Sequence, residues 1–298
     1  MKLFFAFLIT TSSLLSYELK PIKINPYTYC FIGDTAPVKK ENGGFVSNIC
    51  LLKSDNSIIA IDAGPTYTFA KELDAMANKL FNHSITEVIL TNYHDDRVIG
   101  ASYFQDHNIP IYAVEGTSEA ITKNEMRFQR IPKEVGEELY KGSYIPTHFR
   151  TIASSTPLNK NIDIMKLSPI SNSSTDLVVY DKRTKFIFAG NVVFNERAIG
   201  YFPDSDVDGW LLAIEKLKQL SAYQIIGGHG KQYDVKSYET TQNYLRAMKA
   251  QIPKLYDQGV GLEAIVQKCD FSDFKHLQYF NDLNGKNIYN YYMQVELQ

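Results

Sequence analysis

Blocks of like charge are missing from this chain of 298 residues. Its 31 Lys and Arg stand against 33 Asp and Glu, which gives a formal net charge of -2. A protein that binds nucleic acid or an anionic membrane through electrostatics usually carries a clustered basic face. The sequence therefore predicts no nucleic-acid partner, and its scattered charges are typical of an ordinary solvated surface.

Long apolar runs are scarce as well, and the one candidate lies at the start of the chain. Lys2 precedes a mostly apolar stretch over residues 3–15, and Ser16 is a small residue at a plausible cleavage point. A membrane span needs about 20 apolar residues, so this run is typical of an export signal rather than of an uncleaved anchor. We expect a signal peptide over residues 1–16, no stable membrane span, and a periplasmic or secreted protein.

Cysteine is rare too, and none of the three residues has the spacing of a zinc site. Cys30 and Cys50 lie on two apolar runs that are joined by the polar turn segment 33–44. If these runs pair as a hairpin, the two sulfurs face each other, and a disulfide can form in an oxidising compartment. Two buried free thiols are an equally good interpretation, and Cys269 has no obvious partner.

The apolar pattern predicts a group of strands followed by helices, twice over. Strands are expected at residues 28–32, 45–53, 57–62, 88–90, 109–114, 177–180, 185–189 and 223–226. Helices are expected at residues 65–80, from 97 onward, at 208–220 and in the closing segments. This order favours an α/β fold, a four-layer αββα sandwich, in residues 17–255. Residues 256–298 are expected to form a helical extension packed on it.

A polar, partly helical stretch over residues 116–142 is predicted to cover a site as a lid. Pro132 interrupts its helical pattern. Its two arginines, Arg127 and Arg130, are interpreted as a solvated helix face rather than as an anion clamp.

The most informative segment is residues 91–100, Thr-Asn-Tyr-His-Asp-Asp-Arg-Val-Ile-Gly, which follows a short apolar run. It predicts the end of a strand, a tight polar loop and the start of a helix. Side chains two apart on an extended segment point the same way, so Asn92 and His94 are expected to converge on one point. Asp96 and Arg97, at the turn into the helix, are expected to face a second point.

Four loops in this order resemble the metal-binding loops of the metallo-β-lactamase superfamily. The first loop there is T-H-x-H-x-D-H-x-G-G, and the later loops are G-H-T-x-x-D, F-x-G-D and P-G-H-G. This chain has Asn172 in the second, Asn191 in the third and His229 in the fourth. The resemblance covers nearly the whole mature chain and implies the sandwich fold and zinc-dependent hydrolysis.

The later segments are most similar to one periplasmic branch of that family. These segments are 191–194, 206–210, 228–230 and the tail 287–292. The branch comprises zinc metallohydrolases associated with quinoprotein and sulfur-oxidation pathways.

By the same resemblance, most metal ligands are replaced. The first metal position keeps one good donor, His94, and loses two to Asn92 and Asn172. The second keeps Asp96 and His229, with Asn191 and Arg97 beside them. Zinc usually takes at least three donors from His, Cys, Asp and Glu, and an amide is a poor substitute.

One mono-zinc carbapenemase subclass also has Asn and Arg at the positions of Asn92 and Arg97. It keeps a thiolate where this chain has Asn191 and a histidine where it has Asn172. Those two changes are therefore the ones that remove the ordinary site. We expect a pocket at the former metal positions Asn92, Arg97, Asn172 and Asn191.

The sequence favours an exported, hydrolase-like protein with a degenerate zinc centre, acting as a non-catalytic binding or accessory protein. No cofactor is expected, and the partner is an unknown small molecule or periplasmic protein. The alternative is an active single-metal hydrolase of an ester, thioester, lactone or β-lactam-like substrate. One zinc ion would then be held residually by His94, Asp96 and His229, and Asp96 would be catalytic only with the metal bound.

Without a metal, the polar residues need other partners. We expect His94 and Asp96 to form a hydrogen-bonded pair, and Arg97 to neutralise Asp96 through a two-point hydrogen bond. His229 is expected to cap its loop, and Asp62 to stabilise the turn at Gly64.

Overall fold

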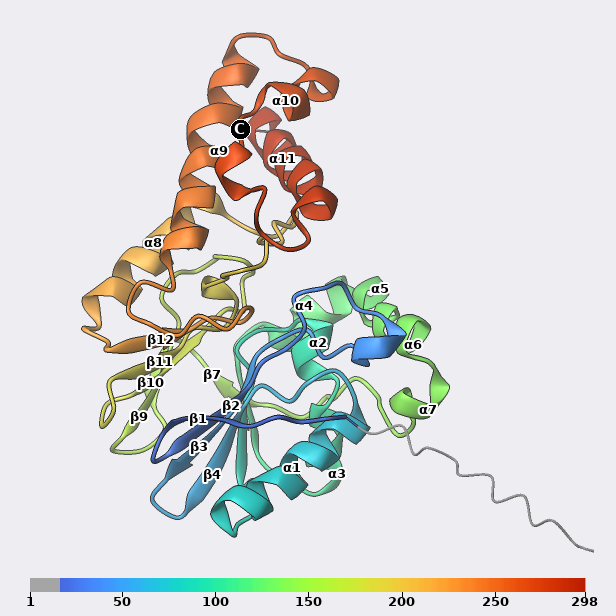
Figure 1. The fold of residues 1–298 in the computed structure, drawn as a ribbon, viewed down its shortest axis with the longest axis vertical. Helices are drawn as coiled ribbons and strands as arrows, with labels where there is room; N and C mark the ends of the chain where they lie inside the picture. Colours follow the sequence, from blue (N-terminus) through green and yellow to red (C-terminus); the bar gives the residue numbers. More distant parts are fainter. Residues whose placement is uncertain (1–16, 298) are drawn as a thin grey trace, which may run out of the picture.

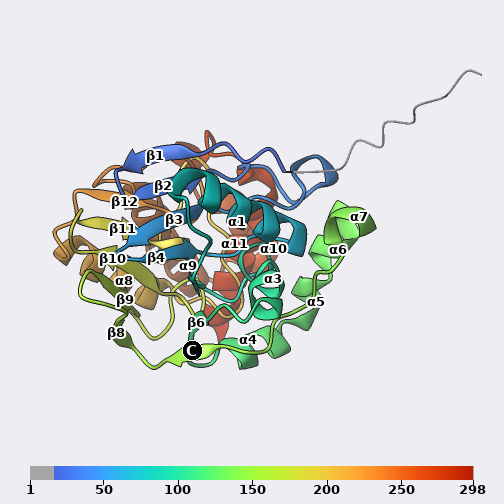
Figure 2. The same ribbon diagram turned by 90° about the horizontal axis from the view of Figure 1, so that it is seen from below.

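The structure is a computed structural model that describes residues 17–297, and the expected signal peptide lies outside the described residues. Two β-sheets pack face to face, and helices cover both outer faces (Figure 1, Figure 2). The predicted αββα sandwich is confirmed. None of the helices in the described part of the chain is long and apolar enough to cross a membrane.

The first sheet has seven strands in the order β1 to β7. Strands β1 to β4 pair antiparallel, and β4 to β7 pair parallel. The bounds are β1 (Ile22–Asn25), β2 (Thr28–Phe31), β3 (Ile49–Ser54), β4 (Ser57–Ile61), β5 (Glu87–Ile89), β6 (Ile111–Val114) and β7 (Arg150–Ile152).

The second sheet has five strands in the order β12-β11-β10-β9-β8, and only β11 and β12 pair parallel. The bounds are β8 (Ser155–Pro157), β9 (Ile162–Met165), β10 (Val178–Asp181), β11 (Phe186–Phe188) and β12 (Gln224–Ile226). The sheets meet through an apolar layer that includes Leu52, Ile59, Val179 and Phe188.

The helices follow the strand groups. Their bounds are α1 (Tyr67–Phe81), α2 (Asp95–Val98), α3 (Ala101–Asp106), α4 (Thr117–Lys123), α5 (Glu125–Phe128), α6 (Arg130–Val135), α7 (Glu137–Tyr140), α8 (Val207–Gln219), α9 (Glu239–Asp257), α10 (Leu262–Lys268) and α11 (Phe280–Glu296). Three short 3-10 turns are η1 (Lys40–Asn42), η2 (Gly190–Val192) and η3 (Ser272–Phe274). Helix α1 begins after Thr66, whose hydroxyl accepts the Phe69 N–H, and it buries Phe69 and Leu73.

Several boundaries differ from the predicted ones for physical reasons. Strands β1, β7, β8 and β9 were not predicted, because they are short and three of them carry mostly exposed or half-exposed side chains. The predicted strand at 45–53 begins only at Ile49, because Asn48 turns away to bind the loop around His229. The helix of the first loop begins at Asp95 instead of Arg97.

Cys30 lies opposite Cys50 where β2 pairs with β3, and the two form a disulfide. This decides between the two interpretations of the sequence. Cys269 is a free, half-buried thiol. A disulfide is typical of proteins outside the cytoplasm, which agrees with the expected localisation.

The C-terminal helices α9, α10 and α11 pack on one another at one end of the molecule (Figure 1). Helix α9 runs across the boundary predicted at residue 255. The predicted division into a domain that ends at residue 255 and a helical extension from residue 256 onward therefore stays a prediction.

Candidate functional site

The four loops that resemble the metal-binding loops of the superfamily meet at one edge of the sandwich. The first follows β5 and supplies Asn92 to Arg97, and the others follow β9, β11 and β12. All the side chains named from these loops are buried: Asn92, His94, Asp96, Arg97, Asn172, Asn191 and His229. Their hydrogen bonds show which of them are in contact.

The Asn191 side chain is the centre of this arrangement. Its Oδ1 accepts from Arg97 Nη2 at 2.6 Å, and its Nδ2 lies 2.9 Å from His94 Nδ1 and 3.1 Å from Asn172 Oδ1. A guanidinium can only donate, so Oδ1 must face Arg97 and Nδ2 must donate to the other two. One amide therefore connects three of the positions at which the superfamily would hold metal.

This orientation also fixes the proton on His94. Because Nδ1 accepts from Asn191, the proton of the neutral ring lies on Nε2, which is buried and has no partner among the described residues. Burial, with the positive charge of Arg127, holds the pKa of His94 well below its usual value, so the ring stays neutral. His94 is not bonded to Asp96, and that expectation was wrong.

Arg97 pairs with Asp62 and not with Asp96, contrary to the prediction. Its Nη1 lies 2.5 Å from Asp62 Oδ2, and its Nη2 also donates to the Gly228 carbonyl at 3.0 Å. Asp62 accepts two further hydrogen bonds, from the Thr91 N–H and hydroxyl, both at 2.7 Å. Asp62 thus neutralises Arg97 and anchors the first loop, a larger role than the predicted stabilisation of the turn at Gly64.

Asp96 stays ionised although it is buried. Burial alone would raise the pKa of its carboxyl group, but the positive charges of Arg97 and Arg130 outweigh this and hold the pKa well below its usual range. Within residues 17–297, no side chain or backbone N–H donates a hydrogen bond to this carboxylate, while its backbone carbonyl accepts from the Ser47 hydroxyl at 3.0 Å. The carboxylate is held by surrounding charge and not by a direct partner.

His229 is fixed by a contact that the sequence did not reveal. Its Nδ1 donates to the Val46 carbonyl at 2.6 Å, and its ring stacks on Phe194 with centroids 4.7 Å apart. A carbonyl only accepts, so Nε2 carries the lone pair. Burial and the charge of Arg197 hold the pKa of His229 well below its usual value.

Within the described residues, the Asn92 side chain makes no hydrogen bond to the side chains of His94 or Asn172. Its Nδ2 donates to Asp176 at 3.2 Å, and its Oδ1 accepts the His94 N–H at 2.9 Å. Asp176 also accepts from the Ser171 hydroxyl at 2.8 Å. Burial raises the pKa of Asp176 to about 6, against the effect of these donors. Asn92 therefore helps to fix the conformation of the first loop.

The segment predicted to be a lid carries Arg127 and Arg130, and their interpretation as a solvated helix face was wrong. Arg127 Nε lies 3.1 Å from the Asp95 carboxylate, and Arg130 holds the same group through Nε at 3.0 Å and Nη2 at 2.7 Å. Asp95 is fully buried. Arg127 also covers the Phe202 ring at 4.8 Å. The lid is thus clamped onto the first loop.

Asp62, Asp95 and Asn48 are the site residues that sequence reasoning missed or undervalued. A charged residue directly after an apolar strand, as at Asp62, is a usable signal for a buried role. Asn48 donates hydrogen bonds to the carbonyls of Gly227 and Gly230. No local sequence pattern around Asn48 predicts this contact.

The donor set of this site does not fit zinc. In residues 17–297 no group of three or more His, Cys, Asp and Glu side chains is placed to hold a metal ion. Asp96 and His229 are the two good donors at the second position, and the third place is filled by the Asn191 amide, which is already bonded. Zinc sites normally need one donor more.

A family model described as the metallo-β-lactamase superfamily matches residues 42–229. Among known proteins, a metallo-β-lactamase type 2 of Bacillus sp. (strain 170) is 23% identical over 191 residues, which are 62% of this chain and 67% of that protein. Another metallo-β-lactamase type 2, from Bacillus cereus, is 30% identical over 78 residues, which are 26% of this chain and 30% of that protein.

Solved structures agree on the fold. The DIM-1 metallo-β-lactamase has a TM-score of 0.61 at 18% identity, covering 77% of this chain and 97% of that one. FIM-1 from Pseudomonas aeruginosa, in its mono-zinc form, has a TM-score of 0.62 at 17% identity, covering 78% and 96%. At such identities the likeness shows the fold alone.

The predicted similarity to the quinoprotein and sulfur-oxidation branch is corrected by these relatives, which are metallo-β-lactamases. The tail that suggested the branch has a packing role. Asn287 accepts the Tyr201 N–H at 2.8 Å and donates to the Ile199 carbonyl at 2.9 Å. Since the family model spans more than half of the chain, this protein belongs to the metallo-β-lactamase superfamily.

Proposed function

We propose that this protein is an exported member of the superfamily that has lost its zinc centre and works as a non-catalytic binding or accessory protein. The observation that carries this proposal is the hydrogen bonding of Asn191 to Arg97, His94 and Asn172. At the first metal position, His94 Nδ1 and the Asn172 and Asn191 amides satisfy one another, whereas the Asp96 carboxylate and His229 Nε2 keep free acceptor atoms. This supports a cleft edge that needs no dication at the first position.

The partner is proposed to be a small molecule or another periplasmic protein. The Cys30–Cys50 disulfide supports a place outside the cytoplasm. The balanced charge of the chain supports a partner other than nucleic acid.

Metal analysis of the untagged mature protein tests this proposal. After dialysis we expect zinc well below about 0.1 equivalent, because fewer than three good donors converge. Close to one equivalent of tightly bound zinc would overturn the proposal.

A pair of variants makes the test sharper. Asn172→His with Asn191→Cys adds an imidazole and a thiolate beside Asp96 and His229, and it should raise bound zinc to about one equivalent. The matched control, Asn172→Gln with Asn191→Ser, changes the same positions without adding a donor and should bind none. Equal zinc in both doubles would show that these positions do not decide metal binding.

The alternative is a single-metal hydrolase, and two side chains that could still bind a metal ion support it. The His229 Nε2 lone pair and the Asp96 carboxylate are both free of hydrogen bonds from the described residues. If the protein hydrolyses an acyl substrate such as a lactone or β-lactam, and loses this activity with a chelator and in His229→Ala, the alternative is right.

A further inference from the structure

Tyr17, the first residue that the structure describes, is fixed by three separate contacts. Its backbone nitrogen donates to the Glu72 carboxylate at 2.9 Å. Its hydroxyl donates to the Gly43 carbonyl at 2.7 Å and lies 2.9 Å from the Thr66 hydroxyl. Its ring meets the edge of the Phe69 ring at a centroid distance of 5.0 Å. The backbone nitrogen, the ring and the hydroxyl group of Tyr17 are therefore each held by a contact.

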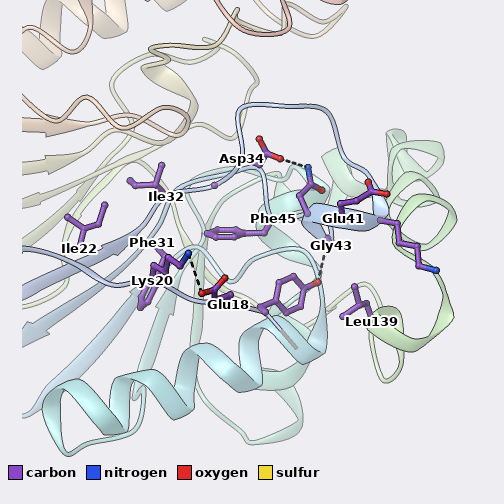
Figure 3. Close-up of a pocket in the computed structure, with 14 residues that line it drawn as sticks. Glu18, Lys20, Ile22, Phe31, Ile32, Asp34, Glu41, Gly43, Phe45 and Leu139 are labelled. Atoms are coloured by element: carbon purple, nitrogen blue, oxygen red, sulfur yellow. Dashed lines mark hydrogen bonds and ion pairs between the residues drawn. The ribbon is translucent and has the colours of Figure 1, made fainter. Parts of the chain in front are cut away.

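The residues around Tyr17 leave room for its ring and bind its hydroxyl group. Gly43 has a φ of 58°, and a Cβ at this position would lie 2.6 Å from the Tyr17 ring. Thr66 is the N-cap of α1, so the Tyr17 hydroxyl joins the start of that helix. A cavity of about 710 Å³ opens beside Tyr17 and is lined by Glu18, Phe45 and Leu139 among others (Figure 3).

Glu72 lacks a cationic partner. Among residues 17–297, no lysine, arginine or histidine nitrogen lies within 4.0 Å of its carboxylate. Partial burial raises the pKa of Glu72, whereas the Tyr17 N–H and the charge of nearby Lys71, which makes no ion pair with it, lower the pKa. A half-buried carboxylate that receives one amide N–H is only partly compensated, because no full positive charge lies in direct contact with it.

We propose that a signal peptidase cleaves the chain between Ser16 and Tyr17, and that the α-ammonium group released on Tyr17 forms an ion pair with Glu72. The cleavage adds one water molecule. Its oxygen enters the new carboxylate of Ser16, and the Tyr17 nitrogen becomes an ammonium with three N–H donors. Processing then turns a hydrogen bond between an amide N–H and a carboxylate into an ion pair that holds the mature N-terminus on α1. The inference rests on the proposed export and is independent of the metal site.

Intact-mass measurement gives the first test. The full-length chain is expressed with its own signal in a Gram-negative host and purified from the periplasm. The expected mass is that of residues 17–298, and a chain that begins elsewhere overturns the inference. The outcome says nothing about zinc, so failure here is distinct from failure of the non-catalytic assignment.

The second test measures the Tyr17 amino group itself. The rate of its acetylation is followed against pH, with the peptide Tyr-Glu-Leu as reference. An adjacent carboxylate favours the charged amine, so the midpoint should lie about half to one pH unit above that of the peptide, and labelling near pH 7 should be about three to ten times slower. Steric shielding alone would lower the plateau without moving the midpoint.

Matched variants assign the effect to Glu72. Glu72→Gln should restore the peptide midpoint, whereas Glu119→Gln, an exposed acid on α4, should leave it shifted. If Glu72→Gln does not accumulate, the comparison of the unmodified protein with the peptide still decides. Equal midpoints there, or an unchanged midpoint in Glu72→Gln, would refute the ion pair.

Discussion

At the scale of single residues, the pairing of Arg97 with Asp62 decides how the rest of the site is arranged. Both side chains are buried, and Arg97 also donates to Asn191 and to the Gly228 carbonyl. Arg97 therefore orients the Asn191 amide, and through that amide it fixes the tautomer of His94. One buried charge thus sets the orientation of neutral groups at positions where the superfamily holds metal.

Removing one partner of the Arg97–Asp62 pair should lower the free energy of unfolding. Asp62→Asn leaves a buried guanidinium without its carboxylate, and we expect a loss of about 3 to 5 kcal/mol in the free energy of unfolding. Arg97→Met should cost a similar amount, and the double variant should cost less than the sum because the residues share one interaction. Urea unfolding measures all three.

The partly exposed pair of Lys182 and Asp163 serves as the control. Asp163→Asn should cost less than about 1 kcal/mol. Strict additivity of the Asp62 and Arg97 variants would contradict the argument.

Asp96 should make stability depend on pH. Its pKa is held far below the usual range, so its stabilising contribution is fully present above the unfolded pKa of about 3.9 and is lost as pH falls below that value. Asp96→Asn should therefore lower the free energy of unfolding by about 1 to 3 kcal/mol at pH 7, and by less near pH 3. The same difference at both values would mean that the charge of Asp96 does not matter.

At the scale of elements, residues 116–142, the segment predicted to be a lid, are held on the first loop by charged contacts, here called the charge clamp. Asp95, at the start of α2, receives hydrogen bonds from Arg127 on α5 and Arg130 on α6. Helices of four to six residues have little stability of their own, so this clamp and the apolar contacts hold them in place.

Loss of the clamp should loosen the lid. Asp95→Asn should speed limited proteolysis within residues 116–142 several-fold, because local opening no longer breaks two ion pairs. Glu125→Gln, an exposed acid on α5, is the matched control and should leave the rate unchanged. Mass spectrometry of the fragments locates the cuts, and cuts confined to other segments would argue against the clamp.

The Cys30–Cys50 bridge should stabilise the pairing of β2 with β3. Its cysteines are 20 residues apart, and closing such a loop contributes about 3 kcal/mol. Cys30→Ser with Cys50→Ser should therefore lower the free energy of unfolding by about that amount. Cys269→Ala, which removes the free thiol, should change it by less than about 1 kcal/mol. A double variant as stable as the parent would show that strand pairing alone suffices.

At the scale of the whole molecule, the C-terminal helices share a core with the second sheet. Phe280, Ile288 and Tyr291 from α11 are buried in the same cluster as Trp210 and Tyr244. Asn287 adds two hydrogen bonds to the loop at Ile199 to Tyr201. The extension lies outside the segment 42–229 that matches the family model, yet it completes the core.

Removing residues 256–298 should therefore prevent stable folding, because it exposes the apolar surface that α11 covers. We expect the shortened chain to be insoluble or to bind a hydrophobic dye, whereas removal of residues 297–298 should have no effect. A soluble, cooperatively unfolding chain of residues 17–255 would instead show that the extension is an independent unit.

The sequence alone determined the layers of the fold and the identity of the four loops. Apolar periodicity and turn residues act locally, so β4, α1, β10 and α8 could be placed within about two residues. Motif order then identified Asn172, Asn191 and His229 as neighbours in space, although long stretches of chain separate them from the first loop.

Only the tertiary structure decided which group each buried charge and amide contacts. Asp62 and Arg97 are 35 positions apart, and Asn191 lies 97 positions from His94. A hydrogen bond depends on distances of tenths of an ångström and on side-chain rotation, and no sequence pattern encodes these. For that reason only the folded structure shows what Arg97 contacts. The same holds for Arg127, Arg130 and the Tyr17 nitrogen.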